Sequence, residues 1–401
     1  MRIIINECKK ILDIRIILLL CMFSILYYMT FTQIYRYPTG GQVTNTKYDI
    51  PFTAELVKEW GPKWKVKDEK QYQEKHQQLE RGFVKIIKQD QELSKRGIVD
   101  YEIFNKKYEE LGQKTTLSKQ EKELGKILEN YVFYNDKTSK IFLDIQALEH
   151  IREFQGSEYG VSDKKYKELK ADGFFDGTKL YQKAIEKRVK RDYISLVHEG
   201  VFYILQEDMV TIGGLIMICF FALIIPYQLK QRLRQVIPIL ATTKTGRRIY
   251  QIQLIASALA ALFVGILQMA VYGIIWHLKG LSVFWRCESW GIASNSYWCD
   301  KLSFGTYMLL YMALILLFAI ASIVIIDFIG RTIGNYMGAV AVSIPVCGVM
   351  MFLMRKIYYM LFLITNDQVL AYWELYALAT WLIVMLLFYK IRSKRWKKVD
   401  L

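Results

Sequence analysis

The chain has 401 residues, of which 53% are hydrophobic, and its formal net charge is +16. Residues 34–208 hold 32 Lys and Arg against 30 Asp and Glu, whereas the remaining residues hold 22 against 8. The excess positive charge therefore lies in short polar segments among apolar runs. This pattern is typical of basic segments that orient a protein in a membrane and contact anionic lipid headgroups. We therefore expect a lipid bilayer as a partner and no nucleic acid.

Six apolar runs are about 20 residues long, which is the length needed to cross a bilayer. They predict an all-α polytopic membrane protein with six transmembrane helices, at residues 14–34, 209–229, 252–276, 305–328, 335–354 and 372–390.

Residues 1–13 predict a cytoplasmic amphipathic helix, because Ile4, Cys8, Ile11 and Leu12 share one helical face. The following run, 14–34, is too long for the apolar part of a secretory signal. It also lacks a small-residue cleavage site, so we expect it to remain as transmembrane helix 1.

Residues 35–208 predict an extracytoplasmic, mainly helical domain inserted between the first two transmembrane helices. Apolar residues recur at helical spacing between Leu79 and Ile151, with Asp100 as an expected N-cap. Ser118 and Glu121 have the spacing of a capping box. We expect a last helix, at about 178–206, to lead directly into transmembrane helix 2 at 209–229.

Residues 230–250 have the sequence KQRLRQVIPILATTKTGRRIY, with six cations and no acidic residue. A short loop of this charge beside membrane spans is typical of the cytoplasmic side. Residues 251–390 then hold transmembrane helices 3–6, and residues 391–401 form a basic cytoplasmic tail. Both termini are expected in the cytoplasm of a bacterium, with the chain in its plasma membrane. We interpret 357–371 as interfacial or re-entrant, not as a seventh span.

Three further patterns lie within or beside the last four spans. Cys287 and Cys299 share one polar loop, where they either form a disulfide or remain free thiols. Asp327 and Arg331 have the spacing of a helical ion pair. The small residues at four-residue spacing allow close helix packing within the chain or in a dimer, and they are Gly330, Gly334 and Gly338.

The sequence lacks a GxxxxGK[ST] phosphate loop, an HExxH or GxSxG motif, and Cys/His pairs at zinc-binding spacing. We therefore expect no enzyme activity of the chain alone, no metal, and no cofactor bound by it. Ionisable residues lie at the ends of the spans, whereas ion-coupled carriers usually keep them near the bilayer centre. Transport would then be driven by another subunit.

The six spans, the large inserted domain and the segment LATTKTGRRIY at 240–250 together resemble the permease subunits of ABC transporters of the ABC-2 exporter type. The resemblance rests on a Thr-Lys-x-Gly-Arg pattern in the loop after the second span. It implies that 230–250 is a coupling loop that docks on an ABC-type ATPase subunit, which binds the ATP, and that a second permease subunit completes the transporter. The implied docking residues are Pro238, Lys244, Thr245, Gly246, Arg247 and Arg248.

Two functions are compatible with these patterns. The chain is expected to be a permease subunit that moves an amphipathic peptide, lipid or drug outward. The alternative is a membrane-anchored sensor or scaffold whose inserted domain binds a ligand or partner. The basic loop is likewise compatible with docking or with simple anchoring at lipid headgroups. An ATPase that co-purifies with the chain would distinguish the two functions.

Overall fold

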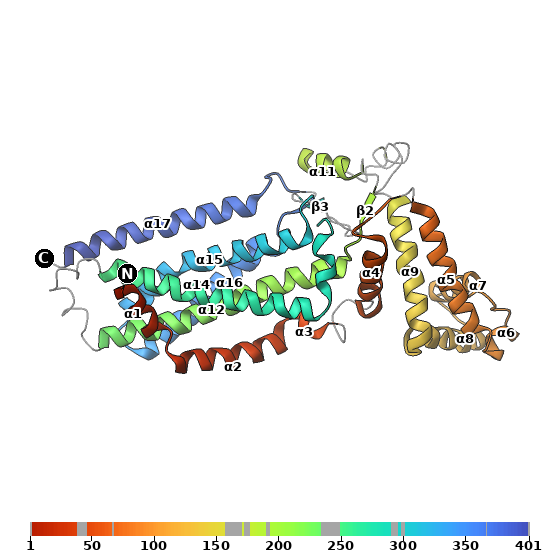
Figure 1. Ribbon diagram of the computed structural model, residues 1–401, viewed down its shortest axis with the longest axis horizontal. Helices are drawn as coiled ribbons and strands as arrows, with labels where there is room; N and C mark the ends of the chain where they lie inside the picture. The colour runs from red at the N-terminus through yellow and green to blue at the C-terminus, as the bar shows by residue number, and fades with distance from the viewer. Residues whose placement is uncertain are drawn as a thin grey trace.

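A computed structural model describes residues 2–37, 46–65, 68–156, 171, 177–189, 193–233, 249–289, 296–297, 301–365 and 367–399 (Figure 1). The α-helices in this part are α1 (Arg2–Ile11), α2 (Ile14–Phe31), α3 (Gln33–Arg36), α4 (Thr46–Trp60), α5 (Glu69–Ile87), α6 (Gln91–Lys95), α7 (Tyr101–Gln113), α8 (Lys119–Glu129), α9 (Asp136–Gly156), α11 (Lys179–Val189), α12 (Glu199–Leu233), α14 (Ile249–Leu278), α15 (Phe304–Thr332), α16 (Tyr336–Tyr358) and α17 (Trp373–Val399). A π-helical turn, η2 (Asn130–Tyr134), and a 3₁₀ helix, η4 (Leu281–Arg286), complete the helical elements. The short strands are β1 (Lys63–Lys65), β2 (Tyr193–Ser195), β3 (Ser296–Tyr297) and β4 (Leu363–Ile364).

Six helices in the described part of the chain are long and apolar enough to cross a membrane, namely α2, α12, α14, α15, α16 and α17. They confirm six apolar helices of spanning length at the expected positions, and the mainly helical fold is compatible with an all-α multi-pass membrane protein. The helix α12 is the most buried and lies at the centre, where it packs on α2, α14, α15 and α16. The helices α2, α16 and α17 leave most of their side chains uncovered.

Figure 1 shows both chain termini at one end of this helix bundle and α4–α9 beyond the other end. We call the end that holds α1 and the last turns of α12, α15 and α17 the basal end, and the other the distal end. At the distal end, Asp208 of α12 accepts hydrogen bonds from the backbone N–H groups of Gln33 and Ile34, at 2.5 and 2.9 Å. The short helix α3 is thereby fixed on α12.

The segment before the second span differs from expectation. The predicted continuous helix at 178–206 is wrong, because α11 ends at Val189 and strand β2 precedes α12. The strand forms because it pairs antiparallel with β1, with Trp64 opposite Ile194. Both of these side chains are buried in the pairing. The helix α12 then begins at Glu199, ahead of the predicted span boundary at 209.

We call residues 46–195 the inserted domain, and its described residues bury apolar side chains in two cores. The first contains Trp64 and side chains of α4, and it is continuous with the core of the six-helix bundle. The second is separate and lies within α5–α9, where Phe83, Phe104 and Phe142 pack edge-on or tilted against one another. Asp100 caps α7 and Ser118 forms a capping box with Glu121, so these sequence predictions are confirmed.

Glu288, which follows η4 between α14 and α15, joins the inserted domain to the bundle. Its carboxylate binds the Lys63 ammonium at 2.8 Å and the Tyr193 hydroxyl at 2.9 Å. Its backbone carbonyl accepts a hydrogen bond from the Ser195 hydroxyl at 2.9 Å. One residue therefore holds both strands of the β1–β2 pair against the distal end.

The helix α16 continues through Pro345 to Tyr358. The following segment contains β4, paired with β3, and no helix of membrane-crossing length in its described residues. Its backbone is strained, since Met360, Phe362 and Tyr372 have positive φ angles of 60°, 61° and 54°. The Tyr307 hydroxyl and the Glu374 carboxylate hold this segment by hydrogen bonds to the backbone of residues 361 and 362.

Candidate functional site

The residues expected to dock on an ATPase lie outside the described residues. They all fall within 234–248, and they are Pro238, Lys244, Thr245, Gly246, Arg247 and Arg248. The structure does describe the base from which this loop extends, since α12 ends at Leu233 and α14 begins at Ile249. Both positions lie at the basal end, beside α1 and the end of α15 (Figure 1).

Buried polar side chains gather at this base. Each is less than 9% exposed although the surrounding helices are mainly apolar. They come from α1, α12, α14 and α15, and we call them the polar network: Glu7, Tyr227, Gln228, Gln231, Gln253, Asp327 and Arg331.

The first half of the network connects α1, α12 and α14. The Gln231 amide donates to the Glu7 carboxylate at 3.0 Å, and the Tyr227 hydroxyl donates to the same carboxylate. The Gln253 amide nitrogen donates to Gln231 Oε1 at 2.6 Å. The two helices that flank the 234–248 loop are therefore joined directly by a pair of glutamines.

The second half continues from α14 through α15 and returns to α12. Arg331 Nη2 donates to Gln253 Oε1 at 2.9 Å, and Arg331 Nε donates to Asp327 Oδ2 at 2.7 Å. The Gln228 amide nitrogen donates to Asp327 Oδ1 at 2.5 Å. The predicted pair of Asp327 and Arg331 is confirmed, but it is buried within a larger network.

Helical spacing explains how α12 and α15 contribute. Tyr227 and Gln231 are four residues apart on α12, and Asp327 and Arg331 are four apart on α15, so each pair projects from one face of its helix. Arg232 then donates to the backbone carbonyls of Arg331 and Thr332 at 3.0 and 2.6 Å. This guanidinium satisfies the carbonyl groups that the end of α15 leaves without helical partners.

Each charge in the network has an opposite charge beside it, which is Arg331 for Asp327 within the network and Lys10 for Glu7 outside it. The Asp327–Arg331 pair has side chains only 1–2% exposed, and the Arg331 guanidinium also lies 5.0 Å from the centre of the Tyr250 ring. Burial acts to raise the pKa of Glu7, but hydrogen bonds from Lys10, Tyr227 and Gln231 outweigh it and lower this pKa. Glu7 is therefore a carboxylate, bound to the Lys10 ammonium at 2.6 Å. Each of these charge pairs lies within one helix, so the relative positions of the helices are fixed by the hydrogen bonds that Glu7, Asp327 and Arg331 make to side chains of neighbouring helices.

The three predicted packing glycines lie in different elements. Gly330 is in α15, where a Cβ atom would lie 2.8 Å from Gln228 Cβ, so α15 and α12 approach closely there. Gly334 lies in the connection between α15 and α16, and Gly338 lies in the first turn of α16, beside its N-cap Asn335. The three glycines therefore do not share one helix, because α15 ends at Thr332.

Cys287 is buried, and its thiol donates to the backbone carbonyl of Leu196 at 3.6 Å. Cys299 lies outside the described residues, so the disulfide between them stays a prediction.

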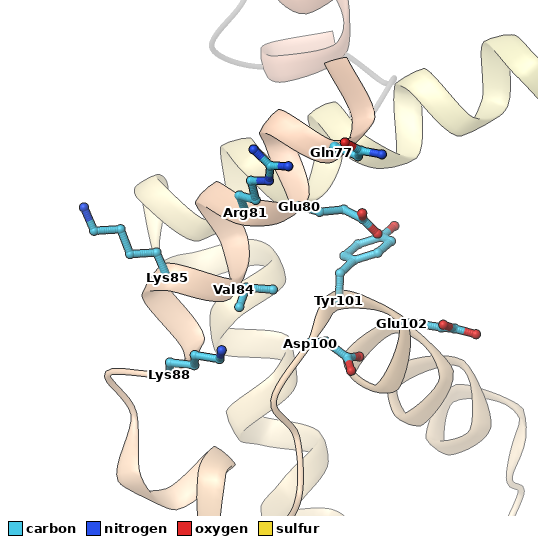
Figure 2. A pocket seen from close by; sticks show the side chains of 9 residues that line it. All are labelled: Gln77, Glu80, Arg81, Val84, Lys85, Lys88, Asp100, Tyr101 and Glu102. Carbon is cyan, nitrogen blue, oxygen red and sulfur yellow. The ribbon is translucent and has the colours of Figure 1, made fainter. Parts of the chain in front are cut away.

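A second candidate site lies in the inserted domain, far from the polar network. It is an open cleft of about 590 Å³ between α5 and the start of α7. Figure 2 shows Arg81, Lys85 and Lys88 along α5, and Asp100, Tyr101 and Glu102 on the opposite wall. Glu80 extends from α5 toward Tyr101, whereas the Lys85 ammonium points away from it. The cleft therefore has one mainly basic and one mainly acidic wall.

The two sites differ in what they can do. Among the described residues, no group of three His, Cys, Asp or Glu side chains could hold a metal ion. The polar network consists of amides, a phenol and charged groups. Their hydrogen bonds connect four helices, so that a movement of one helix is passed to the others. The cleft offers separated opposite charges, which suits recognition of a polar ligand.

Sequence reasoning missed most of the network. Only Asp327 and Arg331 were expected to interact, whereas Glu7, Gln231 and Gln253 were not recognised. A usable signal existed, because glutamine is unusual near the ends of apolar helices and a buried amide requires a partner.

Three comparisons bear on identity. No protein family, no curated protein and no solved structure matches this chain.

Proposed function

We propose that the chain is the permease subunit of an ATP-driven exporter of the ABC-2 type. A separate ABC-type ATPase binds the 230–250 loop on the cytoplasmic side, and a second permease subunit, identical or homologous, completes the transport path. The uncovered apolar faces of α2, α16 and α17 are available to lipid and to that second subunit.

The observation that carries the proposal is the network at the base of the loop. Gln231 and Gln253 belong to the two helices that flank residues 234–248, and they bond to each other and to groups on α1 and α15. A displacement of the loop by the ATPase would therefore move four helices together. A loop that served only as an anchor at the membrane surface would not require such a connection.

Charge supports a cytoplasmic position for the basal end. The described cations at this end include Lys9, Lys10, Arg15, Lys230, Arg232, Lys390, Arg392 and Lys394, which come from α1, α2, α12 and α17. By the positive-inside rule, this end faces the cytoplasm, where ATP is available. The inserted domain then lies outside, where it caps the exit or holds an amphipathic substrate such as a peptide, lipid or drug.

The proposal is tested by isolation of the tagged chain from its native membranes. We expect an ATPase with a Walker A motif to co-purify and to hydrolyse ATP. The variant Arg247→Glu/Arg248→Glu should lose both, while Lys9→Glu/Lys394→Glu, with the same charge change at the same end, should retain both. If the isolated chain carries no ATPase, or if both variants behave alike, the proposed docking is wrong.

The alternative, a ligand-binding sensor or scaffold, is favoured by one observation, the charge-divided cleft between α5 and α7. A cleft of this kind also fits a permease that recognises its substrate outside the membrane. The isolation experiment separates the two functions, because a sensor needs no ATPase.

A further inference from the structure

A smaller cavity lies at the basal end, beside the polar network. It has a volume of about 290 Å³ and lies where the α1–α2 junction, α12 and the first turn of α16 meet. Its polar lining includes Lys10, Lys230, Tyr227 and Gln231, and its apolar lining includes Ile16 and Tyr336. All of these elements end at this face of the bundle, which places the cavity at the level of lipid headgroups if the six helices cross the membrane.

The cavity offers groups that bind phosphate. Two ammonium groups, from Lys10 and Lys230, border it together with the amide of Gln231. Asp13 also lines it, but its carboxylate accepts a hydrogen bond from the Arg15 backbone N–H at 3.0 Å as the N-cap of α2. Glu7 binds Lys10 at 2.6 Å and offsets its positive charge, so Lys230 contributes more of the attraction for an anion.

Apolar surface continues from the cavity along two helices. On α2, Ile14 and Leu18 are 65% and 63% exposed, and on α16, Met337 and Val340 are 83% and 52% exposed. A ligand whose polar head entered the cavity could therefore extend apolar chains along these helices. Phospholipids have this combination of a phosphate head and apolar chains, whereas soluble phosphates have only the head.

We propose that this cavity binds the phosphate headgroup of an anionic phospholipid, with the acyl chains lying along α2 and α16. The inference goes beyond the proposed function and holds whether or not an ATPase binds the loop. It also has a consequence for the polar network. Tyr227 and Gln231 belong to both, so a bound headgroup touches the residues that join α12 to α1 and α14. The lipid thereby favours one arrangement of these helices.

The test is native mass spectrometry of the purified full chain after reconstitution with phosphatidylglycerol and phosphatidylcholine in equal amounts. The wild type should retain phosphatidylglycerol preferentially. Lys10→Gln/Lys230→Gln should bind it about tenfold more weakly, because basic residues at the membrane surface attract anionic headgroups. Lys9→Gln/Lys394→Gln removes the same charge outside the cavity and should bind as the wild type does.

Three results would overturn the inference. The first is equal retention of the two lipids by the wild type, and the second is an equal loss of phosphatidylglycerol binding in the two double variants. The third is displacement of the lipid by inorganic phosphate alone, which would indicate a site for free anions. Ile16→Trp serves as a second variant, since it fills the cavity without a change of charge. It should also lose the lipid, and retention of phosphatidylglycerol by a folded Ile16→Trp protein would count against the cavity.

Discussion

Gln253 on α14 donates a hydrogen bond of 2.6 Å to Gln231 on α12, directly beneath the loop that connects these two helices. Each glutamine also bonds to a charged side chain, Gln231 to Glu7 and Gln253 to Arg331. This pair links the two helices that flank the proposed docking loop, and it makes the role of the network testable.

Replacement of Gln253 by Leu should uncouple the loop from the helices. The variant leaves the Gln231 carbonyl and the Arg331 guanidinium without a shared partner, which costs about 1–3 kcal/mol of stability. It should also reduce ATP hydrolysis by the complex of permease and ATPase, because movement of the loop no longer reaches the other helices. Gln268→Leu is a matched control on the same helix, because it removes a bond of 2.7 Å to Ser24 away from the loop. If the two variants lose ATP hydrolysis equally, the network has no special role.

Asp327 and Arg331 should show the behaviour of a buried ion pair. Arg331→Met leaves an unpaired carboxylate and should destabilise the protein by about 3–5 kcal/mol, whereas Asp327→Leu/Arg331→Met should recover part of this loss. Thermal unfolding of the single and double variants in detergent measures the effect. Additive losses in the double variant would show that the two side chains do not interact.

Gly330 should tolerate no side chain. In Gly330→Ala the new Cβ would lie 2.8 Å from Gln228 Cβ, so α15 and α12 must separate at a cost of about 1–3 kcal/mol. Gly348→Ala on α16 is the control, since no atom lies within 4 Å of the added Cβ. A lower unfolding midpoint is expected for the first variant only, and equal midpoints would argue against close packing at Gly330.

The inserted domain should be less stable at neutral pH than at mildly acidic pH. Burial raises the pKa of Asp144 to about 7 and that of Asp49 to about 7, and both lie where α9 packs on α4. For Asp144, Glu55 and Asp49 add to this shift and Lys140 opposes it. The folded state therefore binds more protons than the unfolded state between about pH 4 and pH 7, so stability falls as pH rises through this window.

Thermal unfolding of the full chain at several pH values checks this expectation. Asp144→Asn is neutral at every pH and should flatten the dependence, whereas Glu123→Gln, on the exposed face of α8, should leave it unchanged. A midpoint that rises between about pH 5 and pH 8 would contradict the assignment.

Hydropathy and helical periodicity predicted the parts of the fold that depend on local sequence. The six spans, the helices between Leu79 and Ile151, and the caps at Asp100 and Ser118 each have their signal within a few residues. Strand β2 has no such signal, because three residues are too few to show alternation. It forms only because β1, far away in the chain, pairs with it.

The network could not be predicted for a related reason. The bond between Gln231 and Glu7 joins residues 224 positions apart, and its existence depends on how α1 packs against α12. That Gly334 lies between two helices could have been predicted in part. Asn335 is a favoured N-cap residue, and its side chain accepts the Gly338 N–H at 2.6 Å, which marks the start of a new helix.

The central claim is that the loop and the inserted domain lie on opposite sides of a membrane, with the loop on the side that holds ATP. Its most direct test uses a chain whose six cysteines are replaced, with one new cysteine at either Arg247 or Glu110. A membrane-impermeant maleimide is added to right-side-out vesicles. We predict that Glu110→Cys is labelled at once and that Arg247→Cys is labelled only after the membrane is opened. Labelling of Arg247→Cys in sealed vesicles would contradict the account.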